Sequence, residues 1–436
     1  MVRISVGVIL KVNIAQEEEF LVFSFTIEED DRRDSNQKFT IGDTNVKVEI
    51  GNSDLSNIHP DLIALCSILM CHPFIGKKLE FPLGVSDQFR QNFKKVVSRY
   101  EFISPCSSKV DPRTVSDGFR MGLAYSGGVD STAALSVLPS DTVPIFMLRP
   151  ERGKSLYNPE AALKSCNSLL EIGYDVKIVK CDVEYLRNPV GFPTDLSHAI
   201  PAILLADELS IDSLSFGTVL ESAFGIGHEE YRDYFSGAHK RFYGSMLKSV
   251  GIDLCLPVSG ISEVGTAMIV DSSPLGSFSQ SCIRGKWGKP CKRCWKCCRK
   301  GLLTAALSSN RLSSKEIDLM LSSKEVREKL SSIPISHENV IEFSMQRIQK
   351  NVHPRLELLS KRVERGTELD YLERWYGPSI GLVPQKYRRG VKERIMKLMS
   401  PMTEEDEQNV ENWSMTDFIE SEFTIEIGST IKEDWI

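Results

Sequence analysis

Residues 124–132 read AYSGGVDST, and this stretch decides the fold of the chain. It follows a predicted strand and opens a predicted helix. Gly127 and Gly128 let the backbone turn tightly and approach a ligand, and N–H groups at a helix start donate to phosphate oxygens. Serine and threonine hydroxyls in the stretch add further donors. Because the lysine of a Walker A loop is missing, we expect this phosphate loop (residues 124–132) to hold a departing pyrophosphate.

Around the phosphate loop, residues 118–305 alternate between strand-like and helix-like segments. Strands are expected at 121–125, 142–148, 175–182, 213–218 and 254–258, and helices at 132–138, 159–172, 199–209 and 261–270. This alternation predicts an α/β fold with a five-stranded parallel sheet, whose ligands lie at the carboxyl ends of the strands.

The two flanking regions have other patterns. Residues 1–115 are predicted to form a β-rich α+β domain, with period-two alternation at 2–10, 20–27 and 45–50, helices at 60–70 and 88–100, and a strand at 78–83. Residues 306–436 are expected to be mostly helical. They are rich in lysine and arginine between 350 and 400 and acidic from 403 onward. We expect this acidic tail to fold back on the basic helical face, and a groove for a charged partner is the alternative.

Composition limits the class of protein. The 436 residues suggest roughly two or three domains, and 41% hydrophobic with 26% charged residues is typical of globular chains. The net charge of −6 makes nucleic-acid binding by the whole chain unlikely. Because neither a membrane-spanning stretch nor a signal-peptide cleavage site is evident, no membrane partner and a cytoplasmic location are expected.

Five of the eleven cysteines crowd into the segment 282–298. Cys282, Cys291, Cys294 and Cys297 follow the spacing C-x8-C-x2-C-x2-C, and four thiolates complete a closed tetrahedral zinc site. With no histidine nearby, a structural zinc knot is predicted, and Cys298 is either a neighbour or a substitute for Cys297. The lysines and arginines between 284 and 300 are explained equally well by neutralisation of the thiolates and by nucleic-acid binding.

The hexapeptide SGGVDS resembles the PP-loop signature of the ATP pyrophosphatase superfamily, whose members transfer AMP to an oxygen of their substrate. The resemblance implies catalytic roles for Ser126, Asp130 and Ser131, which would position pyrophosphate and Mg²⁺. It also implies ATP contacts along the loop and at the ends of the second and fourth strands: Ala124, Tyr125, Ser126, Gly127, Gly128, Val129, Asp130, Ser131, Thr132, Met147, Leu148, Gly217 and Thr218.

The cysteine spacing, shortly after the fifth strand, is similar to that of the 7-cyano-7-deazaguanine synthase (QueC) family. This implies an ATP-dependent ligase that adenylates 7-carboxy-7-deazaguanine, lets an amine form an amide, and releases AMP and pyrophosphate. The flanking regions resemble long QueC-like proteins of bacterial antiphage operons, the QatC group of the Qat systems. For that group the implied product is an amide between the deazaguanine and the N-terminus of an operon-encoded partner protein.

The chain departs from the QueC pattern in the loops after the second and fourth strands, at 148–154 and 221–232. The residues expected to contact the substrate there are Glu221, Arg149, Arg152, Lys154 and Arg232. Glu221 is the main candidate to accept the paired N–H donors of a guanine-like edge, and a solvated carboxylate is the alternative.

Three other functions stay open at this point. The chain could be a nitrile-forming synthase that uses ammonia, a tRNA-modifying PP-loop enzyme with residues 350–400 as the RNA platform, or an inactive nucleotide-binding scaffold. The intact SGGVDS favours an enzyme.

Overall fold

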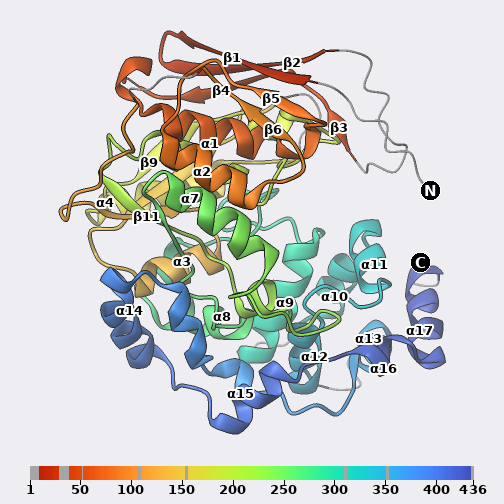
Figure 1. Ribbon diagram of the computed structural model, residues 1–436. Coiled ribbons are helices and arrows are strands. Elements are labelled where there is room, and N and C mark those ends of the chain that lie inside the picture. The colour runs from red at the N-terminus through yellow and green to blue at the C-terminus, as the bar shows by residue number, and fades with distance from the viewer. Residues whose placement is uncertain are drawn as a thin grey trace.

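The computed structural model describes residues 9–28, 39–51, 53–105, 110–152, 156–308, 312–349 and 353–433. An N-terminal sheet, a central α/β layer and a helical C-terminal region follow one another along the chain (Figure 1).

The central sheet is parallel and has the strand order β12-β11-β7-β8-β9. Its strands are β7 (Arg120–Ala124), β8 (Val143–Leu148), β9 (Lys177–Lys180), β11 (Ile211–Ser215) and β12 (Asp253–Cys255). The predicted five-stranded parallel sheet is therefore confirmed. The chain runs outward from β7 to β9 and then returns to the other side of β7, so the strand order reverses there. Ligands of open α/β sheets bind at such a switch point, and the phosphate loop leaves β7 at this position.

Alternating side chains of the central strands enter two separate cores, as the pleat of a strand requires. Met121 and Leu123 of β7 pack on one face, which is covered by α3 (Val129–Val137), α8 (Glu263–Ser272) and α14 (Gln385–Leu398). Val143 and Ile145 of β8 pack on the other face, toward α5 (Ile200–Leu204) and α7 (Ser245–Ser249). The predicted helix 199–209 is shortened to α5: residues 205–210 form turns, and Ser210, with a φ of 54°, leads into β11.

The N-terminal sheet has the order β4-β2-β1-β5-β6. Its elements are β1 (Ile9–Glu17), β2 (Phe20–Glu28), β4 (Asn45–Glu49), β5 (Lys78–Glu80) and β6 (Glu101–Ile103), with α1 (Pro60–Cys71) and α2 (Asp87–Val96) against it. Most of the predicted strand at 2–10 lies outside the described residues. Eleven of the twelve residues of α1 are buried, because this helix lies between the N-terminal sheet and α5 with α7. One apolar core therefore unites the first hundred residues with the central layer.

The N-terminal region also joins the central sheet at its β9 edge. Strand β3 (Thr40–Ile41) pairs with β10 (Arg187–Asn188). Nearby, the Lys47 amide donates to Asp182 Oδ1 at 2.7 Å. These contacts fix the segment that follows β9.

The C-terminal region is helical, as predicted. It comprises α9 (Trp295–Leu307), α10 (Ser314–Leu321), α11 (Lys324–Leu330), α12 (Glu338–Arg347), α13 (Pro354–Val363), α14, α15 (Glu404–Glu411), α16 (Thr416–Ile419) and α17 (Glu422–Glu433). Part of the acidic tail folds back as expected: Arg374 binds Asp406 at 2.5 Å, and α17 packs on α11 and α13 (Figure 1). None of the helices among the described residues has the length and apolar character needed to cross a bilayer.

Candidate functional site

A pocket of about 710 Å³ opens at the carboxyl ends of β7 and β11, beside the phosphate loop. We call it the site pocket. Its lining includes the predicted residues Ala124, Ser126, Asp130, Ser131, Gly217, Thr218 and Arg232, together with Asp195, His198, Tyr234, His239 and Lys296. The volume falls within the range of roughly 300–1,000 Å³ that small-molecule sites occupy.

Two glycines give the phosphate loop its shape. Gly127 has a φ of 71°, a backbone conformation that side chains disfavour. Gly217, at the end of β11, lies so close that a Cβ there would meet the Ser131 amide nitrogen at 2.8 Å. The loop and the end of β11 are thus in close backbone contact, and a side chain at position 217 would not fit.

The loop hydroxyls divide into two groups. Ser126 Oγ and Ser131 Oγ lie 3.1 Å apart, and both residues line the site pocket. Tyr125 and Thr132, expected among the ATP contacts, instead point into the protein, where the Tyr125 hydroxyl binds Thr132 Oγ1 at 3.2 Å and Ser165 Oγ at 2.8 Å. Their side chains stabilise the loop from behind.

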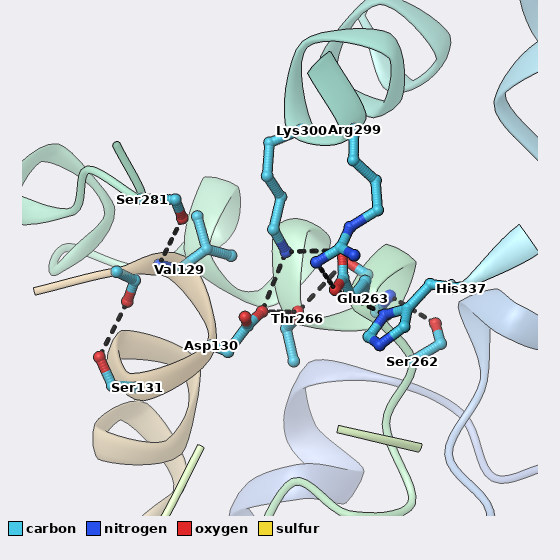
Figure 2. Close-up of polar contacts among 12 residues, drawn as sticks. Val129, Asp130, Ser131, Ser262, Glu263, Thr266, Ser281, Arg299, Lys300 and His337 are labelled. Carbon is cyan, nitrogen blue, oxygen red and sulfur yellow. Dashed lines mark hydrogen bonds and ion pairs between the residues drawn. The ribbon is translucent and has the colours of Figure 1, made fainter. Parts of the chain in front are cut away.

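The segment that leads into the cysteine cluster lies against the phosphate loop. The Gln280 amide donates to the Gly127 carbonyl at 2.8 Å, and the Val129 amide donates to Ser281 Oγ at 3.2 Å (Figure 2). Because Cys282 follows directly, the position of the cysteine cluster is coupled to the backbone of the loop.

The carboxylate of Asp130 is held from two directions. Lys300 Nζ and Thr266 Oγ1 each donate to its Oδ1 at 3.0 Å (Figure 2). Its second oxygen, Oδ2, has no hydrogen-bond partner among the described residues. Asp130 therefore keeps a fixed orientation and one oxygen for a ligand in the site pocket.

Lys300 also contacts Glu263, a buried carboxylate at the start of α8. Glu263 lies 3.2 Å from Lys300 Nζ, 2.6 Å from an Arg299 nitrogen and 2.8 Å from His337 Nδ1. Figure 2 shows Lys300 and Arg299 reaching from α9 toward Asp130 and Glu263, with His337 approaching from the other side. These partners hold the pKa of Glu263 well below its usual value, although burial alone would raise it.

The Glu263 cluster, formed by Glu263, Arg299, Lys300 and His337, was not predicted from the sequence. The only signal in the sequence for Arg299 and Lys300 is their place in the basic segment beside the cysteines, which neutralisation of the thiolates and nucleic-acid binding explain equally well. Glu263 itself was read only as part of the predicted helix 261–270. Its partners come from α9 and from the residue before α12, and no local pattern connects these elements.

The four predicted cysteines come together. The sulfur atoms of Cys282, Cys291, Cys294 and Cys297 all lie within 4.8 Å of one another. The Cys291 and Cys297 sulfurs are 3.7 Å apart, close to the spacing of about 3.8 Å that follows from Zn–S bonds of about 2.3 Å in a tetrahedron. Backbone amides donate to Cys282 Sγ and Cys294 Sγ at 3.3 and 3.4 Å. The cluster could therefore bind a metal such as zinc.

Cys298 stands apart from this group. It is fully buried in the core between α9 and the neighbouring helices, and burial raises the pKa of its thiol to about 12. Its sulfur is not part of the group of four whose sulfurs lie within 4.8 Å of one another, so the geometry favours Cys297 over Cys298 as the fourth ligand.

Two of the predicted substrate residues have other partners. Arg149 binds Glu184 at 2.7 Å, and Arg152 binds Asp182 as well as Asp43, the latter at 2.9 Å. Neither arginine lines the site pocket. The structure places them instead where they attach the segments after β8 and β9 to each other and to the N-terminal region. Lys154 lies outside the described residues.

Glu221, expected to recognise the base, does not line the site pocket. Its side chain is fully buried, its oxygens accept from the Glu263 amide at 3.1 Å and from Asn339 Nδ2 at 3.0 Å, and burial raises its pKa. The residue lies in the first turn of the short helix α6 (Leu220–Phe224) and points toward Asn339 of α12, away from the site pocket. Sequence position placed Glu221 after β11 but could not give the direction of its side chain.

The end of β8, expected to contact adenine, does not reach the site pocket. Met147 and Leu148 pack in the two apolar cores on either side of the sheet. The crevice lies between β7 and β11, and the contacts of the adenine remain a prediction.

Comparisons with known proteins add one finding. The model of a family of unknown function (DUF6395) matches residues 242–414. The matched segment contains the four cysteines and the Glu263 cluster but not the phosphate loop. No curated protein and no solved structure is significantly similar to the chain.

Proposed function

We propose that this chain is an ATP-dependent carbon–nitrogen ligase that adenylates 7-carboxy-7-deazaguanine and joins it to the N-terminus of a partner protein in an antiphage system. The observation that carries the proposal is the placement of the phosphate loop at the switch point of a parallel sheet, where it opens onto the site pocket. The resemblance to the QueC family supplies the identity of the acid.

The chemistry requires activation of the acid, because a carboxylate has no acceptable leaving group. A carboxylate oxygen attacks the α-phosphorus of ATP, and pyrophosphate leaves with the electron pair of the broken P–O bond. An amine then attacks the carbonyl carbon, the C–N bond forms, and AMP leaves with the former carboxylate oxygen. The first step needs hydrogen-bond donors around the pyrophosphate. The second step needs a binding site for the amine.

The residues of the phosphate loop fit the first step. Ser126 and Ser131 would donate to pyrophosphate oxygens, together with the N–H groups at the start of α3. Asp130 would hold Mg²⁺ through Oδ2, the oxygen that Lys300 and Thr266 leave open. Arg232, exposed on the pocket lining, would pair with the carboxylate of the acid.

Zinc fits the cysteine cluster as a structural ion. Four thiolates complete its coordination and leave no position for a substrate. The proposed contribution of this zinc knot is to hold residues 280 and 281 against the phosphate loop.

The test is pyrophosphate release from ATP in the presence of 7-carboxy-7-deazaguanine, followed by intact mass spectrometry of the adjacent operon-encoded protein. The wild type is expected to release pyrophosphate and to add the mass of the acid minus water to that protein. Ser126→Ala combined with Asp130→Ala should abolish both signals while leaving the fold intact. Full activity of the double variant would refute the assignment, and release of free nitrile from ammonia would indicate a nitrile synthase instead.

A further inference from the structure

The wall of the site pocket formed by His239, Tyr234 and Asp195 carries a second group of polar side chains. His239 Nδ1 lies 2.7 Å from the Tyr234 hydroxyl, and His239 Nε2 lies 3.8 Å from Asp195 Oδ2. All three residues line the site pocket. They come from two segments, because Asp195 precedes α5 whereas the other two precede the π-helical turn Lys240–Gly244. Such turns often occur at functional sites.

The surroundings hold the imidazole ring in place and keep it neutral. The Tyr243 ring packs on His239 with centroids 4.4 Å apart, and the Tyr243 hydroxyl accepts from the Asp195 amide at 3.2 Å. Burial lowers the pKa of His239, and the Asp195 carboxylate only partly opposes this shift. Tyr234, Tyr243 and Asp195 are the titratable groups that face the ring, and burial raises the pKa of both phenols, so they stay protonated near neutral pH.

We propose that His239 Nε2 and Asp195 Oδ2 form the binding site for the attacking amine, with His239 as its general base. The inference rests on the proposed ligase function and names the residues for its second step. Either tautomer of His239 is compatible with the contact to the Tyr234 hydroxyl, and acceptance of an amine N–H selects the one in which Nδ1–H donates to the Tyr234 oxygen and the lone pair of Nε2 faces Asp195. A nitrogen about 2.9 Å from each acceptor bridges a gap of this size. A neutral primary amine would give one N–H to each acceptor and keep its own lone pair for the carbonyl carbon.

The protons balance in this arrangement. A free α-amino group has a pKa of about 8, so its neutral form is accessible near neutral pH. When the C–N bond forms and AMP leaves with the electron pair of the C–O bond, the nitrogen carries one surplus proton. That proton passes to His239 Nε2, and the resulting imidazolium is stabilised by Asp195 until it loses the proton to solvent. No further reactant is required.

The distribution of charge in the site pocket gives the nucleotide and the attacking amine different places to bind. The phosphate loop and Lys296 supply the donors and the cation that phosphates require. Lys296 has no ion-pair partner among the described residues. The Asp195 side chain, 80% exposed, would repel phosphates and attract an amine. A nucleotide and an amine therefore have distinct places in one pocket.

The experiment measures the two half-reactions separately in full-length protein. Pyrophosphate release reports adenylation, and capture of the acyl group is followed with glycinamide, a primary amine, and with hydroxylamine, which is largely unprotonated at neutral pH. His239→Ala and Asp195→Asn are expected to keep pyrophosphate release within about twofold but to slow glycinamide capture by at least about 100-fold. Hydroxylamine capture should persist, and added imidazole should restore part of the glycinamide reaction in His239→Ala.

The control is Lys240→Ala, which changes the adjacent residue, whose ammonium lies over the exposed Phe235 ring, and should leave both half-reactions unchanged. Sarcosinamide, with a single N–H, should be captured more slowly than glycinamide by the wild type. Unimpaired glycinamide capture by a folded His239→Ala variant would overturn this amine site and leave the ligase proposal standing. Absence of acid-dependent pyrophosphate release in the wild type would overturn the ligase proposal itself.

Discussion

Glu263 connects the phosphate loop to the C-terminal region through ion pairs between individual side chains. Lys300 bridges it to Asp130, while Arg299 and His337 contact its other sides. Removal of a buried carboxylate, or of one of its cationic partners, strongly destabilises a protein because the remaining buried charges lose their compensation. The cluster therefore stabilises the fold and orients the carboxylate of the loop.

Glu263→Gln is expected to destabilise the protein by about 3 kcal/mol at neutral pH, and the difference from wild type should depend on pH. The pKa of Glu263 is depressed in the folded protein. Its contribution to stability is therefore present above the unfolded pKa of about 4.3 and is lost as the pH falls through the lower folded pKa. Chemical denaturation of both proteins across this range measures the effect, and a difference that stays constant with pH would contradict it.

Lys300→Met should reduce pyrophosphate release by roughly 10- to 100-fold, since Asp130 loses the ammonium that fixes its Oδ1. The matched control is Lys292→Met in the same basic segment, because Lys292 binds Glu316 and does not contact the loop. Equal rates of pyrophosphate release in the two variants would show that Lys300 does not orient Asp130 for the reaction.

At the scale of residues, the sequence predicted the members of the loop that line the site pocket better than it predicted contacts between distant segments. Ser126, Asp130 and Ser131 could be chosen because the motif and its place between strand and helix are local. The ion pairs of Arg149 and Arg152, and the inward direction of Glu221, depend on segments distant in the chain. Lys300 reaches Asp130 across 170 residues of sequence, so no spacing rule could connect them.

At the scale of elements, the cysteine cluster and the phosphate loop behave as one unit. The residues before Cys282 bind the loop backbone through Gln280 and Ser281. A change in the cluster should therefore reach the phosphate loop, even though the four sulfurs belong to a separate motif.

We expect one zinc ion per chain by mass-spectrometric metal analysis. Cys291→Ser should lose the metal, unfold more readily and release pyrophosphate more slowly, whereas Cys298→Ala should keep the metal because Cys298 lies outside the cluster. An iron–sulfur chromophore, or a Cys298→Ala variant without metal, would show that the cluster has been misassigned.

The elements of the central layer were predictable because each strand and helix carries its own periodicity. The way in which these elements pack together was less predictable. The complete burial of α1 follows from its position between two sheets, and the attachment of β3 to β10 joins short segments without a pattern of their own.

At the scale of the whole molecule, each flanking region shares a core with the central layer, and the C-terminal helices have a further core of their own. The largest core extends from Leu10 of the N-terminal sheet to Val143 and Ile145 of β8. A second core joins β7 to Val391 and Ile395 of α14. Removal of either flanking region would therefore expose apolar surface of the central layer.

Thermal unfolding should consequently show one cooperative transition that includes the N-terminal sheet. Differential scanning calorimetry of the full chain, with tryptophan fluorescence as a second probe, measures this. Two well-separated transitions would mean that the N-terminal region folds as an independent unit in spite of the common core.

The central claim is that the site pocket joins a carboxylate to AMP. The most direct measurement supplies 7-carboxy-7-deazaguanine with heavy oxygen in its carboxylate, together with ATP and the amine acceptor, and determines the mass of the nucleotide product. We expect AMP that carries one heavy oxygen atom, transferred from the acid when the amide forms. Formation of ADP and phosphate, or of AMP without the label, would contradict it.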